Sequence, residues 1–261
     1  MTFFKKMKSL ARQIAIRVYK IITHAGAVNY RNEGVINLID VGAIGELPDP
    51  WFDKARLVKN LLRFEPRESP SVHPNIISLD YALGGRNETR PFHIYRGNNS
   101  HGSSFYEPNV EFVDANFAKL KKAGSPKLAQ TWHERAQLHK TIPVPCRTLD
   151  SVLEELKLDF TFDFLKIDAQ GAEYDILTGS EQFLANHCLG LQLELFKYPM
   201  YKGIALKDEV VAFLKARGFE LVKEFPPHGT FHCASDCIFL KKVVTPRQDM
   251  KKRLLRKIFG L

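Results

Sequence analysis

Cysteine is scarce in this sequence, and an apolar leader is missing. Four of the 261 residues are cysteine, and the chain does not start with a cleavable apolar segment. A disulfide-stapled secreted scaffold is therefore excluded, and we expect a cytoplasmic protein with reduced thiols. Cys233 and Cys237 lie close to His228 and His232, but their spacing matches no standard zinc finger. We expect these thiols in the core or in loops.

Acidic residues are missing from residues 1–24, which hold six basic residues and a charge of +6. Residues 241–261 hold eight basic residues and Asp249, which gives +7. The formal charge of the whole chain is +9, so residues 25–240 carry −4. The positive charge lies in two terminal arms around a mildly acidic body. A nucleic-acid enzyme more often has its positive face on the folded body, so nucleic acid is not the expected partner.

Both arms have the pattern of amphipathic helices, with apolar residues every three or four positions and Lys or Arg between them. The apolar stretches are too short and too charged to span a bilayer. Two interpretations stay open: the helices dock on the domain, or they bind the inner surface of an anionic membrane. The apolar positions are Phe3, Met7, Leu10, Ile14, Val18 and Ile21 in the first arm and Met250, Leu254, Ile258 and Leu261 in the second.

Strand-like and helix-like segments alternate through the body, and no internal repeat interrupts them. GVINLID, LLRFEP, NIISLDYALGG, RPFHIYR, DFLKIDAQG and CLGLQLELF are strand-like, and a helix tail is expected in ARLVKN. CRTLDSVLEELKL predicts a helix with Thr148 or Asp150 as its N-cap. This order predicts an α/β fold with a mostly parallel sheet, and the closing pair FELVKEF and SDCIFLKK adds an antiparallel edge strand. Residues 97–140 predict a loop-rich insertion over the functional site.

Carboxylates and glycines follow several of these strands, where open α/β sheets bind their ligands. The first strand ends at Asp40, before Gly42 and Gly45, and the second ends at Glu65. The set resembles the S-adenosylmethionine site of Rossmann-like methyltransferases, in which glycines let the backbone approach the cofactor and a carboxylate binds the ribose hydroxyls. The cofactor-binding candidates are Asp40, Gly42, Ala43, Gly45, Glu65, Pro66, Tyr81 and Ala82.

A nicotinamide cofactor is the competing interpretation. The glycines at positions 42 and 45 do not complete a G-x-G-x-x-G fingerprint. Pro48 and Pro50 also interrupt the helix start that a pyrophosphate would need. A cationic sulfonium needs no anion cradle and is favoured by nearby carboxylates such as Asp40 and Asp168. The pattern therefore favours the methyl donor.

The segments TLDSVLEEL, DFLKIDAQGAEYDILTG and LQLEL closely resemble the signature of the FkbM-type methyltransferase family, and IDVGAIGELPDPW and LLRFEP resemble the first motifs of one branch. The resemblance spans about residues 35 to 240. It implies a class I methyltransferase fold and S-adenosylmethionine-dependent O-methylation of a sugar, glycan or similar hydroxyl-bearing metabolite. Asp168, Gly171 and Glu173 match the pattern, but Gln170 stands where members commonly have Glu. Glutamine can replace that Glu if it caps the turn, but not if it serves catalysis or ligand binding.

A hydroxyl acceptor must lose a proton, so we expect a base or a metal-bound site. Asp168, at the rim of its strand, is the first candidate for the base. Glu194 ends the next strand and is the second, although it could also form a structural ion pair with Lys166. A histidine base could come from the insertion, at His101, His133 or His139.

Three acidic side chains, Asp168, Glu173 and Glu194, could together bind a divalent cation through oxygen ligands. Two other functions also stay open. One is a nucleic-acid methyltransferase, although no Asn-Pro-Pro-aromatic motif follows a strand. The other is a non-catalytic protein that binds a membrane or a partner through its arms on a methyltransferase-like fold. The retained glycines, Glu65 and Asp168 favour an enzyme over the non-catalytic protein.

Overall fold

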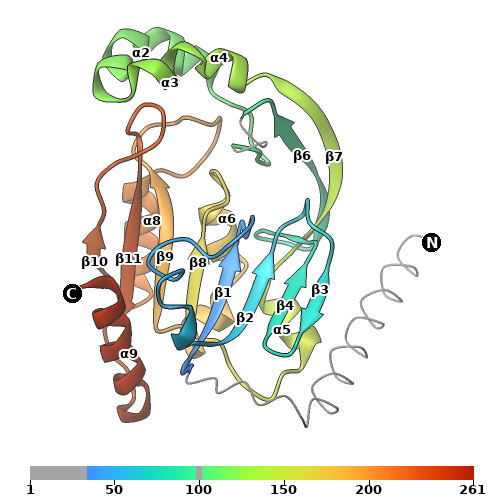
Figure 1. Cartoon of the computed structure of the whole chain (residues 1–261), viewed down its shortest axis with the longest axis vertical. Coiled ribbons are helices and arrows are strands. Elements are labelled where there is room, and N and C mark those ends of the chain that lie inside the picture. The colour runs from blue at the N-terminus through green and yellow to red at the C-terminus, as the bar shows by residue number, and fades with distance from the viewer. Residues whose placement is uncertain (1–33, 98–101) are drawn as a thin grey trace, which may run out of the picture.

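The computed structural model describes residues 34–97 and 102–261. The arm predicted for residues 1–24 lies outside this range, as does His101. In the described part, eight strands form a main sheet in the order β10-β11-β9-β8-β1-β2-β4-β3, and three strands form a smaller sheet (Figure 1). Helices cover both faces of the main sheet. The predicted α/β architecture is confirmed.

The main sheet is built around β1 (Ile36–Val41), all six residues of which are buried. β1 pairs in parallel with both β2 and β8, and the parallel pairing continues outward to β4 and β9. Both faces of the central strands are covered, so β1, β8 and β9 are almost entirely buried. The other main-sheet strands are β2 (Val58–Phe64), β3 (Ser71–His73), β4 (Ile76–Leu79), β8 (Phe164–Ile167), β9 (Gly190–Phe196), β10 (Phe219–Glu224) and β11 (Ala234–Lys241).

Two strands of the main sheet run against the others, so the predicted mostly parallel sheet with an antiparallel edge is confirmed. β3 forms one edge and is antiparallel to β4. β11 lies one position inside the other edge, antiparallel to both β9 and β10. The segment ARLVKN differs from the prediction, since only one 3-10 turn, η1 (Ala55–Leu57), precedes β2. The strand predicted in NIISLDYALGG is divided between β4 and β5 (Ala82–Leu83) of the smaller sheet.

The alternation of side chains along β1 sends apolar groups to two separate cores. Ile39 and Val41 face the core under α5 (Leu149–Leu156), α6 (Glu173–Thr178), α7 (Glu181–Asn186) and α8 (Lys207–Ala216). Ile36 and Leu38 face a second core that contains Trp51 and the C-terminal helix. The predicted N-cap of α5 is confirmed at Thr148, whose side chain accepts a hydrogen bond from the Ser151 N–H.

The insertion at 97–140 is mostly helical, so the expectation of a loop-rich segment is wrong for its described part. It contains α2 (Val110–Ala123), α3 (Pro126–Gln130) and α4 (Trp132–Arg135). The side chains of Asn109 and Ser125 cap α2 and α3. β6 (Glu88–Tyr95) and β7 (Leu138–Arg147) pair as a long antiparallel ribbon that carries these helices over the carboxyl ends of the main-sheet strands (Figure 1).

The helix predicted in residues 241–261 is confirmed as α9 (Pro246–Phe259), and it docks on the domain. The expected apolar stripe is partly wrong, because Met250 is 67% exposed and Leu261 37% exposed, whereas Leu255 and Phe259 are buried. The Phe259 ring stacks on Phe164, 5.4 Å between centroids. The burial of Leu255 and of Phe259 each stabilises the docked helix by about 1.5–3 kcal/mol.

Candidate functional site

The order of the strands reverses between β1 and β8, and their carboxyl ends meet very closely. Gly42 has a φ of +73°, and a Cβ on it would lie 1.9 Å from the Asp168 carbonyl oxygen. Gly42 is therefore needed for contact between two strand ends, a reason that the sequence did not indicate. Gly45 has a φ of +68°, and a Cβ on it would meet no other atom within 4 Å. It is absent from the lining of the cavity described next.

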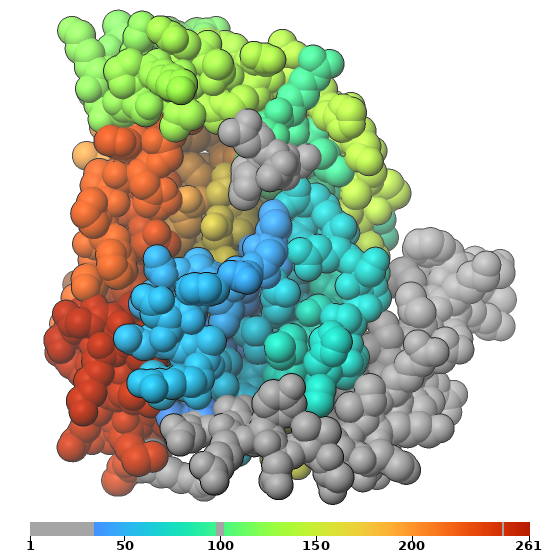
Figure 2. Space-filling view, in the orientation of Figure 1, coloured from blue at the N-terminus to red at the C-terminus, as the bar shows by residue number. Residues whose placement is uncertain are grey.

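A cavity of about 450 Å³ opens above these strand ends, a volume typical of small-molecule sites. Figure 2 shows the hollow under α2–α4 (green), with the β8–α6 segment (yellow) at its floor. One half of the lining contains seven of the eight cofactor-binding candidates. They are Asp40, Gly42, Ala43, Glu65, Pro66, Tyr81 and Ala82.

Glu65 lies at the carboxyl end of β2 and is held there by its neighbour. The Arg67 backbone N–H and Nε both donate to Glu65 Oε1, at 3.1 and 2.8 Å. The Glu65 residue is only 6% exposed, yet it lines the cavity. A fixed carboxylate at this position can accept hydrogen bonds from a ligand that carries hydroxyl groups.

Asp40 is buried beside Lys166, and the two side chains form an ion pair of 3.0 Å. Lys166 Nζ also donates to the carbonyl oxygens of Val41 and Gly42 at 3.2 and 3.4 Å. Burial lowers the pKa of Lys166, but the attraction of Asp40, Asp168 and Glu194 raises it overall. The partner expected for Lys166 was Glu194, and the structure gives Asp40 instead. The lysine neutralises this end of the cavity floor.

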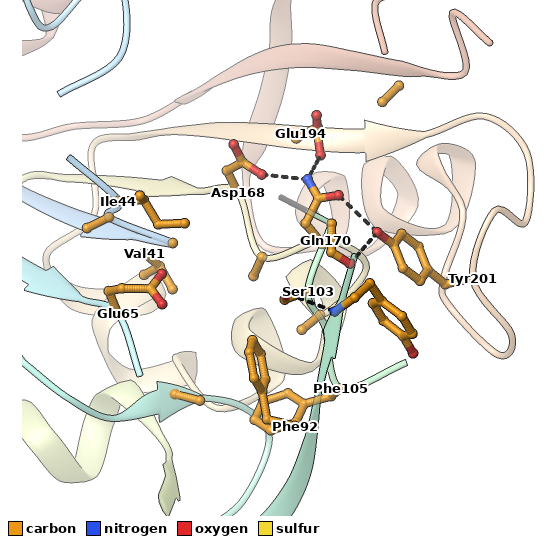
Figure 3. Close-up of a pocket in the computed structure, with 18 of the residues that line it drawn as sticks. Val41, Ile44, Glu65, Phe92, Ser103, Phe105, Asp168, Gln170, Glu194 and Tyr201 are labelled. Carbon is orange, nitrogen blue, oxygen red and sulfur yellow. Dashed lines mark hydrogen bonds between the residues drawn. The ribbon is translucent and has the colours of Figure 1, made fainter. Parts of the chain in front are cut away.

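The side chain of Gln170 joins the two acids that were expected to act as bases. Its Nε2 donates to Asp168 Oδ1 at 2.9 Å and to Glu194 Oε2 at 2.6 Å, and its Oε1 lies 3.0 Å from the Tyr201 hydroxyl (Figure 3). We call Asp168, Gln170 and Glu194 the carboxylate clamp. An amide nitrogen has two protons, so both are used and both acids act as acceptors.

The backbone that presents Gln170 is unusual. Gln170 has a φ of +51° and Gly171 a φ of +103°, a conformation that side chains other than glycine rarely adopt. The Ser104 hydroxyl donates to the Gln170 carbonyl oxygen at 2.7 Å, and Gly171 N–H donates to Glu173 at 2.9 Å. Strain of this kind persists only where the surroundings determine the conformation. The fold thus fixes the amide between the two acids.

Glu173 is buried behind the clamp and acts on the backbone. Its two oxygens accept the N–H groups of Ala169 and Gly171, at 2.8 and 2.9 Å. Burial raises the pKa of this carboxyl group to about 7. The possible cation site of Asp168, Glu173 and Glu194 is not assembled. Within residues 34–97 and 102–261, no group of three or more His, Cys, Asp or Glu side chains is arranged to hold a metal ion.

The pKa of Glu194 is raised well above its usual value, first by burial and then by the charges of Asp168, Glu173 and Asp236. Glu194 lines the other half of the cavity, under the insertion. The walls of this half are largely aromatic and apolar, and Figure 3 shows Glu65 on the opposite side of the cavity from Tyr201. These walls include Phe92, Tyr95, Phe105, Trp132, Phe196, Met200, Tyr201 and Phe231.

Among the described histidines, the one that lies beside the clamp was not a predicted site residue. His133 pairs with Asp114 on the insertion helices at 2.6 Å, and His139 is exposed on β7, so neither lines the cavity. His101 lies outside the described residues. His228 instead lies 3.7 Å from Glu194 and 3.3 Å from Asp236. The sequence signal that could have pointed to His228 was its position in the loop between the last two strands.

Comparison with known families places the chain among methyltransferases. The family model described as the methyltransferase FkbM domain matches residues 40–221. No curated protein matches the sequence significantly.

Several solved structures resemble the fold at low identity. The crystal structure of methyltransferase FkbM from Methylobacillus flagellatus KT has 11% identity and a TM-score of 0.42, and the match covers 78% of this chain but only 43% of that one. Magnesium protoporphyrin IX methyltransferase (ChlM) from Synechocystis PCC 6803 with bound SAM has 10% identity, 88% and 79% coverage and a TM-score of 0.37. Sp1610 of Streptococcus pneumoniae, a putative tRNA (m1A22) methyltransferase, has 15% identity, 92% and 77% coverage and a TM-score of 0.35.

Proposed function

Because the chain belongs to the FkbM methyltransferase family, we propose that it transfers a methyl group from S-adenosylmethionine to a hydroxyl group of a sugar, a glycan or a similar polar metabolite. The observation that carries this proposal is the division of one cavity into two chemically different halves. Glu65 serves the half at the ends of β1 and β2, and the carboxylate clamp faces the half under the insertion.

The residues of the first half fit S-adenosylmethionine. Glu65 would accept hydrogen bonds from the ribose hydroxyls, and the Gly42–Ala43 turn and the Tyr81–Ala82 segment would contact the rest of the nucleoside. Asp40 is already neutralised by Lys166, so Asp168 is the carboxylate left to favour a positive charge. When bound, the cofactor supplies a methyl group on a cationic sulfur, and each transfer to a hydroxyl releases one proton.

The second half fits a neutral acceptor with both hydroxyl groups and an apolar face. Aromatic walls can stack on the C–H face of a sugar ring, and carboxylates accept hydrogen bonds from its hydroxyl groups. An acceptor that brings a phosphate against Asp168 and Glu194 would meet two like charges in a partly dry site. This charge argument favours a sugar or polyol over a nucleic acid.

Asp168 and Glu194 are the groups of the clamp that can receive the acceptor proton. A carboxylate whose pKa is raised by burial is a stronger base when it is ionised, and this is the condition of Glu194. Gln170 holds both acids in the geometry of acceptors at 2.9 and 2.6 Å. The clamp therefore supplies bases that are already oriented, which lowers the barrier by positioning.

The proposal is tested by incubating the full chain with methyl-labelled S-adenosylmethionine and a panel of sugars, glycans and polyols. We expect label in at least one acceptor, and Asp168→Asn should lower kcat about 100-fold or more while weakening cofactor binding much less. Asp208→Asn, an exposed position at the start of α8, is the matched control and should keep the wild-type rate. A wild-type rate for Asp168→Asn would remove Asp168 from the mechanism.

We also propose that the protein works in the cytoplasm and that α9 contacts an anionic membrane surface. In the described residues no helix is long and apolar enough to cross a membrane. The outward face of α9 and the preceding turn combines basic and apolar side chains, as interfacial helices do. The exposed residues are Lys242, Val243, Met250, Arg253, Arg256 and Lys257.

Vesicle flotation tests the membrane contact. The triple variant Arg253→Glu, Arg256→Glu, Lys257→Glu should lose binding to anionic vesicles, whereas neutral vesicles should bind neither protein. Charge reversal is preferable to deletion, because α9 covers the core around Trp51 and Phe164. Equal flotation of the variant and the wild type would refute the role of α9.

A further inference from the structure

Glu194 separates the cavity from a histidine that reaches solvent. Its side chain is 12% exposed and lines the cavity on one side. On the other side lies His228, from the loop between β10 and β11, with a side chain that is 41% exposed. His228 Nδ1 is 3.7 Å from Glu194 Oε1, and His228 does not line the cavity. The carboxylate therefore stands between the site of chemistry and an imidazole that water can reach.

The orientation of the imidazole follows from a chain of polar contacts that starts at Trp51. Trp51 Nε1 donates to Gln192 Oε1 at 3.1 Å, and an indole can only donate. The amide nitrogen of Gln192 must then face Asp236, whose Oδ1 lies 3.5 Å away. The other oxygen of Asp236 lies 3.3 Å from His228 Nε2. This places the N–H of the neutral ring at Nε2 and leaves Nδ1 as the acceptor that faces Glu194.

We propose that His228 is the proton outlet of the site: it takes from Glu194 the proton that the acceptor hydroxyl loses, and it releases that proton to solvent. The inference rests on the proposed O-methyl transfer. In each turnover the acceptor oxygen gains a bond to the methyl carbon, the bond from that carbon to sulfur breaks, and the O–H bond of the acceptor breaks. The proton moves to Glu194 and then to Nδ1 of His228, and it leaves to water from Nδ1, because Nε2 is buried against Asp236. The cationic charge of the donor is thereby matched by one released proton.

Several charged groups face this pair, and they act in the same direction. Glu194 on β9 and Asp236 on β11 are directly opposed across the antiparallel ladder. The pKa of His228 is raised, mainly by the neighbouring Asp236 carboxylate and also by the charge of Asp168 at the end of β8. Burial raises the pKa of Glu194. The distance of 3.7 Å is spanned by a small side-chain rotation or by one water, as at other sites that close on their substrate.

A titration of the full chain tests proton sharing without any acceptor. The ¹³Cε1 signal of His228, assigned with His228→Gln, is followed by NMR as a function of pH. We expect its midpoint above the ordinary value, with a fall of about half a unit or more in both Glu194→Gln and Asp236→Asn. Glu220→Gln, an exposed carboxylate on β10, is the control and should leave the midpoint unchanged. A midpoint at the ordinary value that neither Glu194→Gln nor Asp236→Asn shifts would refute the role of His228 as the proton outlet.

A rate measurement then separates transfer of the proton from support of the fold. With the sugar or polyol that accepts label in the panel, His228→Gln should lower kcat about tenfold or more and leave the KM for the cofactor nearly unchanged. Added imidazole should restore part of the rate, which a purely structural loss would not allow. An unchanged kcat would refute the proposal. Cofactor binding by calorimetry in the same variant shows separately whether the proposed function itself stands.

Discussion

The substitution Gln170→Glu is the sharpest perturbation of the carboxylate clamp, because it changes one NH₂ group into an oxygen. In the wild type that NH₂ group donates to Asp168 at 2.9 Å and to Glu194 at 2.6 Å. In the variant, three carboxylates meet where two acids and a donor were. We expect the folded state to lose stability in a pH-dependent way.

The magnitude follows from the contacts. Two charge-assisted hydrogen bonds are lost, at about 1.5–3 kcal/mol each. Each new pair of like charges at about 4 Å adds up to about 4 kcal/mol at an effective dielectric constant of 20. The folded state limits this cost by binding a proton, so we expect a net loss of about 3–5 kcal/mol near pH 8. A carboxyl whose pKa is raised on folding stabilises the fold at low pH, so the loss should shrink to about half near pH 5.

Urea unfolding at both pH values measures this loss, with and without magnesium. Magnesium should stabilise Gln170→Glu more than the wild type, because only the variant offers three carboxylates at the clamp. Gln182→Glu on the exposed face of α7 is the matched control, and it should change stability by less than about 0.5 kcal/mol. If Gln170→Glu were as stable as the wild type near pH 8, the amide would not be holding the two acids.

Three further predictions concern the support of the site. Burial raises the pKa of Glu173 from 4.5 to about 7. The free energy of unfolding of the wild type should therefore fall by up to about 3 kcal/mol as the pH rises between those values. Urea unfolding of Glu173→Gln should not show that fall. Gly42→Ala should destabilise the protein by more than about 2 kcal/mol, because the new Cβ meets the Asp168 carbonyl. Gly45→Ala has open space around the new Cβ and should cost only about 1 kcal/mol of stability. Equal losses in the two variants would contradict the close contact at Gly42. Lys251→Met removes the 2.6 Å ion pair with buried Asp163 and should lower the free energy of unfolding by about 2 kcal/mol. An unchanged midpoint of urea unfolding would show that this ion pair does not stabilise the docked α9.

The succession of strands and helices along the chain, and the strands that carry carboxylates near their carboxyl ends, could be predicted from the sequence. Glu65 and Asp168 directly follow β2 and β8. Asp40 and Glu194 lie just inside the ends of β1 and β9 rather than at the ends as predicted. Parallel strands bring such ends to one edge of the sheet. These patterns depend on neighbouring residues, so they are visible in the sequence alone. The same holds for the cap at Thr148, which depends on residues three positions apart.

Pairings across the sheet could not be predicted in this way. Lys166 pairs with Asp40 because the register of β1 and β8 sets them side by side, and register is not visible in one strand. The Gln170 carbonyl in its left-handed conformation accepts a hydrogen bond from Ser104, which lies 66 positions earlier in the chain. His228 reaches Glu194 only because β9 and β11 are neighbours.

The helices of the insertion were missed for a related reason. α2 is held in place largely by residues of other segments, since Val113 and Leu120 pack in a cluster with Phe231 and Met200. Their contribution to packing depends on the three-dimensional path of the chain. Tertiary contacts of this kind stabilise helices that sequence periodicity alone does not reveal.

Binding of S-adenosylmethionine to the full chain tests the central claim most directly. Titration calorimetry should show saturable binding at one site per chain, and Glu65→Ala should weaken it about tenfold or more through the loss of hydrogen bonds to the ribose. Glu68→Ala, a half-buried neighbour in the same turn that does not line the cavity, should bind as the wild type does. The absence of binding by the wild type, or undiminished binding by Glu65→Ala, would contradict the assignment of this cavity to the cofactor.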